Sequence, residues 1–302
     1  MKPAGMLAAM VAAVVSAACC PLEPMAEIRA RLPQREFVEV AGQAVHFREG
    51  GKGGVPVLMI HGFGQSGYTF RELGPRLGRR VLAPDLNGFG YTERPPDTAA
   101  YAPGGQEEML ARLVAAKELR RIDIVAHSYG CEIALRLAAH HPQLVRRLVL
   151  ISPALNMDVA PDSAIRNPLV REALYPLLRL LVCDRVRLRA LFERAYFHPD
   201  VLTPETLEEY RRQLLVAGLH RAYRGFGAAI PTMKAGRVEI DGVSQPILIL
   251  AGREDAIVPV ETLPSSGLGH RVAILEEAGH VVPEEAPEDA ASEIRRFLAG
   301  SR

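Results

Sequence analysis

Six short apolar runs are the feature that most constrains how this chain of 302 residues can fold. Segments in which apolar residues recur at helical spacing separate most of the runs. The runs are VLMI (57–60), VLA (81–83), IDIVA (122–126), LVLIS (148–152), ILILA (247–251) and VAIL (272–275). Continuous apolar strands that alternate with helices are typical of a parallel sheet covered on both faces. The runs therefore predict an α/β fold with a doubly wound, mostly parallel sheet, and the alternating stretch at 37–51 predicts a β-hairpin before them.

A long interval between two of these runs carries helical pattern only. From 153 to 231 the sequence has Leu-rich segments and no convincing buried strand. Thr203 followed by Pro204 predicts a helix start, because Thr can cap a helix and Pro suits its first position. We expect a helical cap, or lid, at 153–231, inserted into a core that is formed by residues 36–152 and 232–302.

The first twenty residues (1–20) differ from the rest of the chain. An apolar stretch at 6–18 suits the core of a signal peptide and is short for a membrane span. Ala18 offers a cleavage site, and Cys19 after it resembles a lipoprotein signal. The alternatives are export, which gives a periplasmic or membrane-associated protein, and a short hydrophobic helix packed on a cytoplasmic protein. Residues 21–35 are expected to link this segment to the core.

Composition argues against several kinds of partner and site. The formal net charge is only +1, so nothing indicates binding to nucleic acid. The four Cys residues show no spacing typical of zinc ligands, and we expect no metal site. Cys19 and Cys20 are adjacent and do not suggest a structural disulfide. Cys131 and Cys183 are interpreted as small apolar residues of the core or the cap.

The cap segment carries more Arg than acidic residues. From Arg166 to Arg224 there are 11 Arg and 7 acidic residues. Two interpretations stay open, namely a basic amphipathic surface that meets anionic lipid or an acidic substrate, and a solvated face over a Leu core. The N-terminal segment offers a second route to membrane association. The oligomeric state is left open.

A candidate nucleophile follows the run IDIVA. This run leads into His127, Ser128, Tyr129 and Gly130, and a helical segment begins directly afterwards. A strand, a sharp turn around a central Ser and a helix form a nucleophile elbow, in which the residues two before and two after the Ser must be small. Gly130 meets this demand, and Ala126 is the next smallest choice. The alternative is a Ser that only caps a helix.

A serine nucleophile needs a base, and candidates follow the later strands. Asp255 lies just beyond the run ILILA, where a carboxylate can orient an imidazole, and its neighbour Glu254 is the main competitor. His280 follows Gly279 beyond the run VAIL. The order Ser, Asp, His and the position of each residue after a strand predict a catalytic triad of Ser128, Asp255 and His280.

The stretch HGFGQSG at 61–67 allows two interpretations. Its glycines have the spacing G-x-G-x-x-G of a dinucleotide-binding turn, and Asp85 lies 18 residues beyond Gly67 (85 − 67). The same glycines can instead let the backbone approach a reacting carbonyl group and build an oxyanion hole. The glycine spacing alone does not decide between a phosphate site and an oxyanion hole.

Together these motifs resemble the α/β-hydrolase fold superfamily, in its branch of lid-bearing esterases, lipases and epoxide-hydrolase-like enzymes. The matching stretches are HGFG (61–64), DLNGFGYT (85–92), AHSYG (126–130), GREDAIVP (252–259) and GH (279–280). Ala126 departs from the G-x-S-x-G pattern of this superfamily. The resemblance implies that the backbone N–H groups of Phe63 and Tyr129 form an oxyanion hole, and that Asp85 has a structural role. The residues expected to support the turns of the site are His61, Gly62, Gly64 and Gly130.

The resemblance also implies cleavage of a small-molecule ester or acyl compound through an acyl-enzyme, with no cofactor. Epoxide hydrolases and haloalkane dehalogenases of this superfamily use Asp as the nucleophile, so Ser128 argues against both. Carbon–carbon bond or lactone hydrolysis on the same triad, cleavage of peptides at an N-terminal proline, and a non-catalytic binding role remain as alternatives. Val281 and Tyr129 stand where the carbon–carbon hydrolases and the proline peptidases, respectively, often carry Trp.

Overall fold

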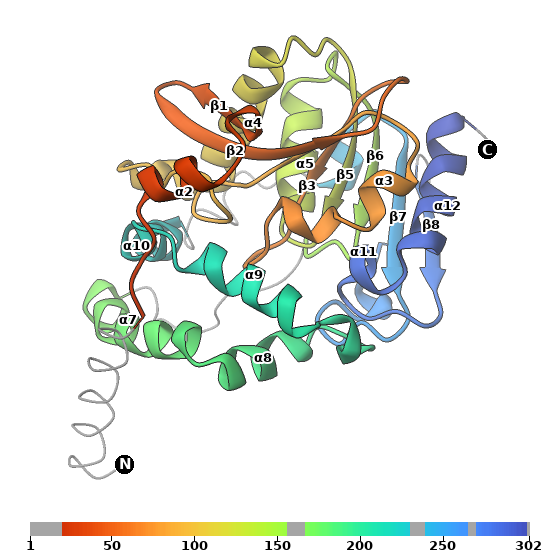
Figure 1. The fold of residues 1–302 in the computed structure, drawn as a ribbon. Coiled ribbons are helices and arrows are strands. Elements are labelled where there is room, and N and C mark those ends of the chain that lie inside the picture. Colours follow the sequence, from red (N-terminus) through yellow and green to blue (C-terminus); the bar gives the residue numbers. More distant parts are fainter. Residues whose placement is uncertain (1–19, 156–166, 230–238, 265–269, 301–302) are drawn as a thin grey trace.

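The structure is a computed structural model that describes residues 20–155, 167–229, 239–264 and 270–300 (Figure 1). The predicted signal or lipoprotein segment, with Ala18 and Cys19, lies outside the described residues, and of this segment only Cys20 is described. Within the described ranges, no helix has the length and the apolar character that a membrane span requires.

A sheet of eight strands forms the centre of the described part of the molecule. The strands are β1 (Phe37–Val40), β2 (Gln43–Gly50), β3 (Val57–Ile60), β4 (Val81–Pro84), β5 (Ile122–His127), β6 (Val145–Ile151), β7 (Ile247–Gly252) and β8 (His270–Leu275). Their order across the sheet is β1-β2-β4-β3-β5-β6-β7-β8. The pairs β1/β2 and β2/β4 are antiparallel, and all other neighbours are parallel. The predicted α/β fold, with its mostly parallel sheet and its N-terminal hairpin, is confirmed.

Each of the six apolar runs forms the larger part of one strand. Strand β6 begins before its run LVLIS, at Val145, and therefore includes Arg146. The guanidinium of Arg146 binds both carboxylate oxygens of buried Asp123 on β5, with 2.7 Å between Arg146 Nε and Asp123 Oδ1. A charged residue can thus extend a buried strand because the neighbouring strand supplies its counter-charge.

Helices cover both faces of the sheet (Figure 1). The described α-helices of the whole chain are α2 (Met25–Arg31), α3 (Leu73–Arg76), α4 (Pro103–Ala116), α5 (Gly130–His140), α7 (Pro168–Cys183), α8 (Arg185–Glu193), α9 (Pro204–Leu214), α10 (Leu219–Ala229), α11 (Val282–Glu285) and α12 (Pro287–Ala299). Leu58 and Ile60 of β3 pack in one apolar cluster with α4 and α5. Val57 and Met59 pack in the other cluster with α3 and α12. Burial on both faces explains why the strands are continuously apolar.

Four helices, α7 to α10, lie between β6 and β7 in the described chain, and we call this part (167–229) the helical insert. Thr203 caps α9 as the sequence predicts, because its side chain accepts a hydrogen bond of 3.2 Å from the N–H of Thr206. The small apolar core of the insert contains Leu188 and Tyr196, and it also includes Val281, the residue after His280. The insert therefore packs directly beside the predicted catalytic histidine.

The stretch 21–35, which was expected to link the N-terminal segment to the core, packs on the rest of the protein. Its helix α2 buries Ile28 in a cluster with Tyr91 and Val216. The backbone N–H of Glu23 donates to the carbonyl oxygen of Leu215 at 2.7 Å. This stretch is therefore held by the insert and the core along its length.

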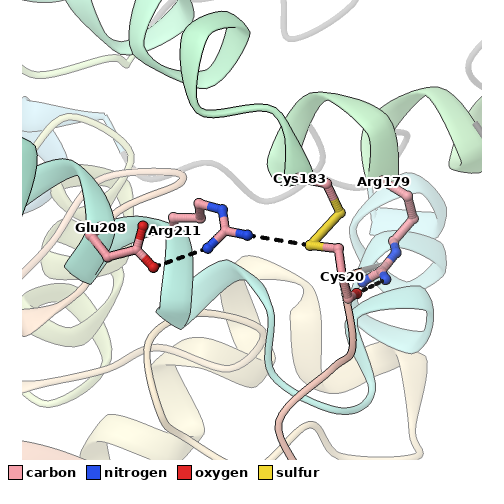
Figure 2. Close-up of a disulfide and its surroundings, with 5 residues drawn as sticks. All are labelled: Cys20, Arg179, Cys183, Glu208 and Arg211. Carbon is pink, nitrogen blue, oxygen red and sulfur yellow. Dashed lines mark hydrogen bonds and ion pairs between the residues drawn. A yellow bond between two sulfur atoms is a disulfide. The ribbon is translucent and has the colours of Figure 1, made fainter. Parts of the chain in front are cut away.

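A disulfide joins Cys20 to Cys183 at the end of α7 (Figure 2). The expectation that Cys20 takes no part in a structural disulfide, and that Cys183 is only a small apolar residue, is therefore wrong. The Cα atoms lie 5.9 Å apart, within the usual range for disulfides, although the sequence separation of the two cysteines is 163. Arg179 donates to the carbonyl oxygen of Cys20, and Arg211 Nη2 lies 3.5 Å from its Sγ. Cys131 is buried and free, in agreement with its predicted apolar role.

Candidate active site

Ser128 lies in the sharp turn between β5 and α5, where the elbow pattern places it. Its φ is +52°, in the left-handed region that costs free energy for a residue with a side chain. A Cβ at Gly130 would lie 2.5 Å from the carbonyl oxygen of Ile60 and 2.7 Å from that of His61. Because backbone atoms line this contact, only glycine fits two positions after Ser128.

The structure brings the three predicted triad residues together. Ser128 Oγ lies 3.0 Å from His280 Nε2, and His280 Nδ1 lies 2.8 Å from Asp255 Oδ2. The backbone N–H groups of Ile257 and Val258 donate to Asp255 Oδ1 at 2.8 and 2.7 Å. All three triad side chains are buried. In this geometry His280 can take a proton from Ser128 while Asp255 orients the imidazole ring.

The charge of Asp255 fits this role. Burial by itself would raise the pKa of Asp255, but the hydrogen bond and the charge of His280, together with the N–H of Val258, hold it below its ordinary value. The carboxylate is therefore ionised at neutral pH. Asp255, rather than its neighbour Glu254, is the residue that contacts His280.

His127, the residue before Ser128, contacts the backbone of the predicted catalytic histidine. Its Nε2 lies 2.8 Å from the carbonyl oxygen of His280, and its Nδ1 lies 2.8 Å from Gln65 Oε1. Burial is the main cause that lowers the pKa of His127 to about 3, and the charge of nearby His280 is a smaller one. Its ring is therefore neutral at neutral pH. A carbonyl oxygen only accepts, and Nε2 of His127 therefore donates to it. His127 thus ties the histidine loop to the elbow.

The predicted oxyanion residues lie beside Ser128. Nδ1 of buried His61 donates to the carbonyl oxygen of Gly62 at 2.8 Å, and its Nε2 accepts from the N–H of Leu86 at 2.9 Å. Gly64 has a φ of +76°, which favours glycine in this turn. Among the hydrogen bonds between described residues, none uses the N–H of Phe63 or of Tyr129. Both N–H groups are thus available to a ligand.

A cavity of about 280 Å³ opens above Ser128, between the core and the helical insert. The insert contributes most of the apolar part of its wall. The lining residues are Phe63, Gly64, Gln65, His127, Ser128, Leu178, Leu181, Val182, Leu188, Leu191, Phe192, Ala195, Tyr196, Leu214, His280 and Val281. None of these described lining residues is Arg, Lys, Asp or Glu. The cavity therefore combines a nucleophile at one end with an apolar wall that has no fixed charge.

The carboxylate of Asp85 is bound by groups of the protein itself. Asp85 is therefore not available to bind a dinucleotide. Its buried carboxylate accepts hydrogen bonds from the N–H of Gly67 at 2.7 Å and of Tyr91 at 2.8 Å. His46 Nδ1 lies 2.7 Å from its Oδ2. Burial by itself would raise the pKa of Asp85, but the charge and the hydrogen bond of His46 outweigh it and lower this pKa to about 2. Asp85 has the structural role that the resemblance implies.

The comparison with protein families gives a match over residues 55–287 to the model described as "alpha/beta hydrolase fold". The chain belongs to the α/β-hydrolase fold family. Within the described residues of this α/β hydrolase, no group of three or more His, Cys, Asp or Glu is arranged to hold a metal ion.

Individual relatives differ in the activity that their names give. The chain is 30% identical to a 2-hydroxymuconate semialdehyde hydrolase of Pseudomonas sp. (strain CF600), over 88% of this chain and 93% of that protein. It is 26% identical to Cfl2 of Burkholderia cenocepacia, with a TM-score of 0.70 over 87% of this chain and 94% of that one. It is also 26% identical to a bacterial membrane phospholipase A, with a TM-score of 0.68 over 91% and 90% of the two chains.

Several residues around the triad escaped the sequence analysis. Gln65 lies within the HGFGQSG stretch, where its Oε1 accepts from the N–H of Gly62 and its side-chain amide lies beside the ring of His127. Glu284 and Glu285, on α11, bind the insert directly after the loop of the predicted catalytic histidine. No local pattern marks Glu284 and Glu285, because their partners in the insert lie far away in the sequence.

Proposed function

We propose that this α/β hydrolase cleaves an ester whose acyl or alcohol group is apolar. The observation that carries this proposal is the cavity, in which Ser128 and His280 meet a wall of Leu, Val, Phe and Ala side chains. Burial of apolar substrate in such a cavity stabilises the complex by roughly 0.8 kcal/mol for each buried methylene. The similarity to a membrane phospholipase A is a further support.

The arrangement of the residues supports a two-step mechanism. Ser128 attacks the ester carbonyl while His280 takes its proton, and the backbone N–H groups of Phe63 and Tyr129 stabilise the oxyanion. His280 then donates this proton to the leaving alcohol, and the acyl group stays on Ser128 as an ester. Water, deprotonated by His280, hydrolyses the acyl-enzyme and restores Ser128. Asp255 stabilises the imidazolium in both steps.

Carbon–carbon bond hydrolysis is the second candidate, and the 2-hydroxymuconate semialdehyde hydrolase at 30% identity favours it. Other relatives carry names that end in dienoate or dienoic acid hydrolase, so the substrates in these names bear a carboxylate. A buried carboxylate needs a cation or several hydrogen-bond donors. The described cavity lining has neither Arg nor Lys, so a carboxylate there would depend on neutral donors such as Gln65 and Tyr196 alone, which favours the ester over the carbon–carbon substrate.

Hydrolysis of p-nitrophenyl esters from acetyl to palmitoyl tests the proposal, with 2-hydroxymuconate semialdehyde assayed beside them. We expect ester turnover by the full chain and a loss of roughly 10⁴-fold or more in Ser128→Ala. Faster turnover of the semialdehyde would favour the carbon–carbon reaction. If lactones are also assayed and are the only substrates turned over, lactone hydrolysis is favoured. A folded protein that turns over none of these substrates would leave the non-catalytic binding role.

We also propose that the protein is exported. The apolar stretch at 6–18 has the length of a signal-peptide core, and the Cys20–Cys183 disulfide is typical of oxidising compartments. Cell fractionation tests this, and a purely cytoplasmic protein with free thiols at Cys20 and Cys183 would contradict it.

The arginines of the helical insert support a solvated face more than a lipid-binding surface. In the described insert, six arginines form ion pairs with acidic residues of the insert itself. These pairs are Arg185–Glu208, Arg187–Asp184, Arg189–Glu193, Arg211–Glu208, Arg212–Glu208 and Arg224–Glu172. This pairing favours the solvated face over the basic membrane surface. Weak or absent binding of a signal-less variant to anionic vesicles is the expected result.

A further inference from the structure

The catalytic histidine loop is bound to the helical insert by its backbone. The N–H of His280 donates to the carbonyl oxygen of Ala195 at 3.0 Å, just after the end of α8. A Cβ at Gly279 would lie only 2.5 Å from the backbone nitrogen of Phe197, so the two segments are in direct contact. On its other side, the carbonyl oxygen of His280 accepts from His127. The position of His280 thus depends on the insert as well as on the core.

Glu285 strengthens this contact with a single carboxylate. Its Oε2 accepts from the N–H of Phe197 at 2.7 Å and from the N–H of His198 at 2.9 Å. Its Oε1 accepts from the N–H of Val281 at 3.1 Å. One carboxylate therefore bridges the insert and the residue that follows His280. Hydrogen bonds to an ionised acceptor are roughly twice as strong as neutral ones.

The preceding residue, Glu284, binds the same region of the insert through side chains. Its buried carboxylate accepts from the hydroxyl groups of Tyr196 and Tyr210, and Arg71 Nη2 lies 3.0 Å away. Tyr196 also lines the cavity. Glu284 thus anchors the insert to the core, whereas Glu285 contacts the backbone on both sides of the joint.

The bridged segment continues directly from the cavity wall. Leu191, Phe192, Ala195 and Tyr196 line the cavity, and the hydrogen bonds to Glu285 begin at the next residue, Phe197. The Ala195 carbonyl group and the Glu285 carboxylate therefore connect this wall to the histidine loop.

We infer that Glu285 is a positioning residue that couples occupation of the apolar cavity to the alignment of His280. This inference rests on the proposed function and deepens it, because it makes the turnover rate, and not only binding, depend on how fully the substrate fills the cavity. In the wild type, we expect this alignment to raise kcat for esters with long acyl groups. An acetyl group is too short to fill the cavity, so it does not have this effect.

The variant Glu285→Gln tests the coupling, since it keeps the shape and replaces one accepting oxygen by an NH2 group. We expect kcat for the best long-chain p-nitrophenyl ester to fall by roughly 10- to 100-fold, because small misplacements of catalytic groups cost this much. The kcat for p-nitrophenyl acetate should fall far less, and KM should change by less than about twofold for either ester. Glu288→Gln, which removes an exposed carboxylate at the start of α12, is the matched control and should keep the wild-type ratio.

A proportional loss on both esters, with a lower melting temperature, would show a merely structural role and overturn the inference. Unchanged kcat values for both esters would do the same. If Glu285→Gln does not fold, Gly279→Ala tests the same joint, because its Cβ would lie 2.5 Å from the Phe197 nitrogen and 2.9 Å from Glu285 Oε1. The same change in the ratio of the two kcat values is expected.

Labelling of Ser128 separates this test from that of the proposed function. Methyl and octyl fluorophosphonates report the activation of Ser128 without any need for ester turnover. If neither reagent labels the wild type, the proposed function fails. If the wild type prefers the octyl reagent and Glu285→Gln retains this preference in full, only the coupling fails.

Discussion

At the scale of single residues, the site depends on a few backbone positions that allow no alternative. Ser128 takes a left-handed conformation, and this is possible because the neighbouring turn packs on the end of β3 without a side chain at Gly130. Strain of this kind persists only where the surrounding structure fixes it. The elbow therefore fixes the backbone of Ser128, whereas the position of His280 also depends on the insert through the Ala195 carbonyl group.

Gly130→Ala should disrupt this arrangement. The new Cβ would lie 2.5 Å from the carbonyl oxygen of Ile60, and neither backbone segment can move away freely. We expect ester turnover and fluorophosphonate labelling of Ser128 to fall by roughly 100-fold. Gly104→Ala is the control. Gly104 lies within helix α4, and a Cβ there would meet only Arg136 Nη2, at 3.4 Å. Wild-type labelling by Gly130→Ala would show that the elbow tolerates a side chain at this position.

Asp85 should make stability depend on acid pH. The pKa of Asp85 is lowered from 3.8 to about 2 in the folded protein, so its contribution is present above pH 4 and is lost as the pH falls from about 4 to 2. This contribution amounts to roughly 2 kcal/mol. Urea unfolding at pH 7, 4 and 2.5 measures it. Asp85→Asn should be less stable at pH 7 and should lose less between pH 4 and 2.5.

Asp241→Asn is the control for this measurement, since Asp241 is exposed. This variant should lose as much stability in acid as the wild type does. An Asp85→Asn protein with the same acid sensitivity as the wild type would contradict the structural role that its hydrogen bonds to Gly67 and Tyr91 indicate.

At the scale of elements, local patterns and distant contacts differ in how far the sequence predicts them. The apolar runs predict strands β3 to β8 because a strand buried on both faces must be apolar throughout. Ser128, Asp255 and His280 could be placed because each lies in a loop or turn beyond the end of a parallel strand. The Cys20–Cys183 disulfide could not be predicted, since its geometry depends on how the N-terminal stretch packs against α7. Glu285 likewise gains its partners only when α11 meets the insert.

The disulfide should be the main covalent stabiliser of the insert. It closes a loop with a sequence separation of 163, and constraints of this kind typically contribute about 2–4 kcal/mol. We expect the double variant Cys20→Ser/Cys183→Ser to lose this amount in urea unfolding. Dithiothreitol should bring the wild type to the same stability and leave the double variant unchanged.

Cys131→Ala controls for the loss of a thiol. Cys131 is buried and free, so this variant should stay as sensitive to dithiothreitol as the wild type. If the reductant leaves the unfolding free energy of the wild type unchanged while it frees Cys20 and Cys183, the disulfide contributes nothing to stability.

At the scale of the whole molecule, the cavity above Ser128 lies where the core and the insert meet. The core supplies Ser128 and His280, and the insert supplies most of the apolar wall. Substrate preference should therefore change with residues of the insert while the triad stays intact. Two leucines one turn apart on α7 allow a sharp test, because Leu181 lines the cavity whereas Leu177 is 47% exposed and does not belong to the lining.

Leu181→Trp should fill part of the cavity and shift the preferred acyl chain of p-nitrophenyl esters to a shorter length. The larger ring removes volume from a cavity of about 280 Å³, so long acyl groups lose their apolar contacts while acetyl turnover persists. We expect kcat/KM for the best wild-type ester to fall by roughly 10- to 100-fold, as the loss of two or three buried methylenes implies. Leu177→Trp should keep the wild-type chain-length profile. Identical profiles for both variants would mean that the acyl group binds elsewhere than in this cavity.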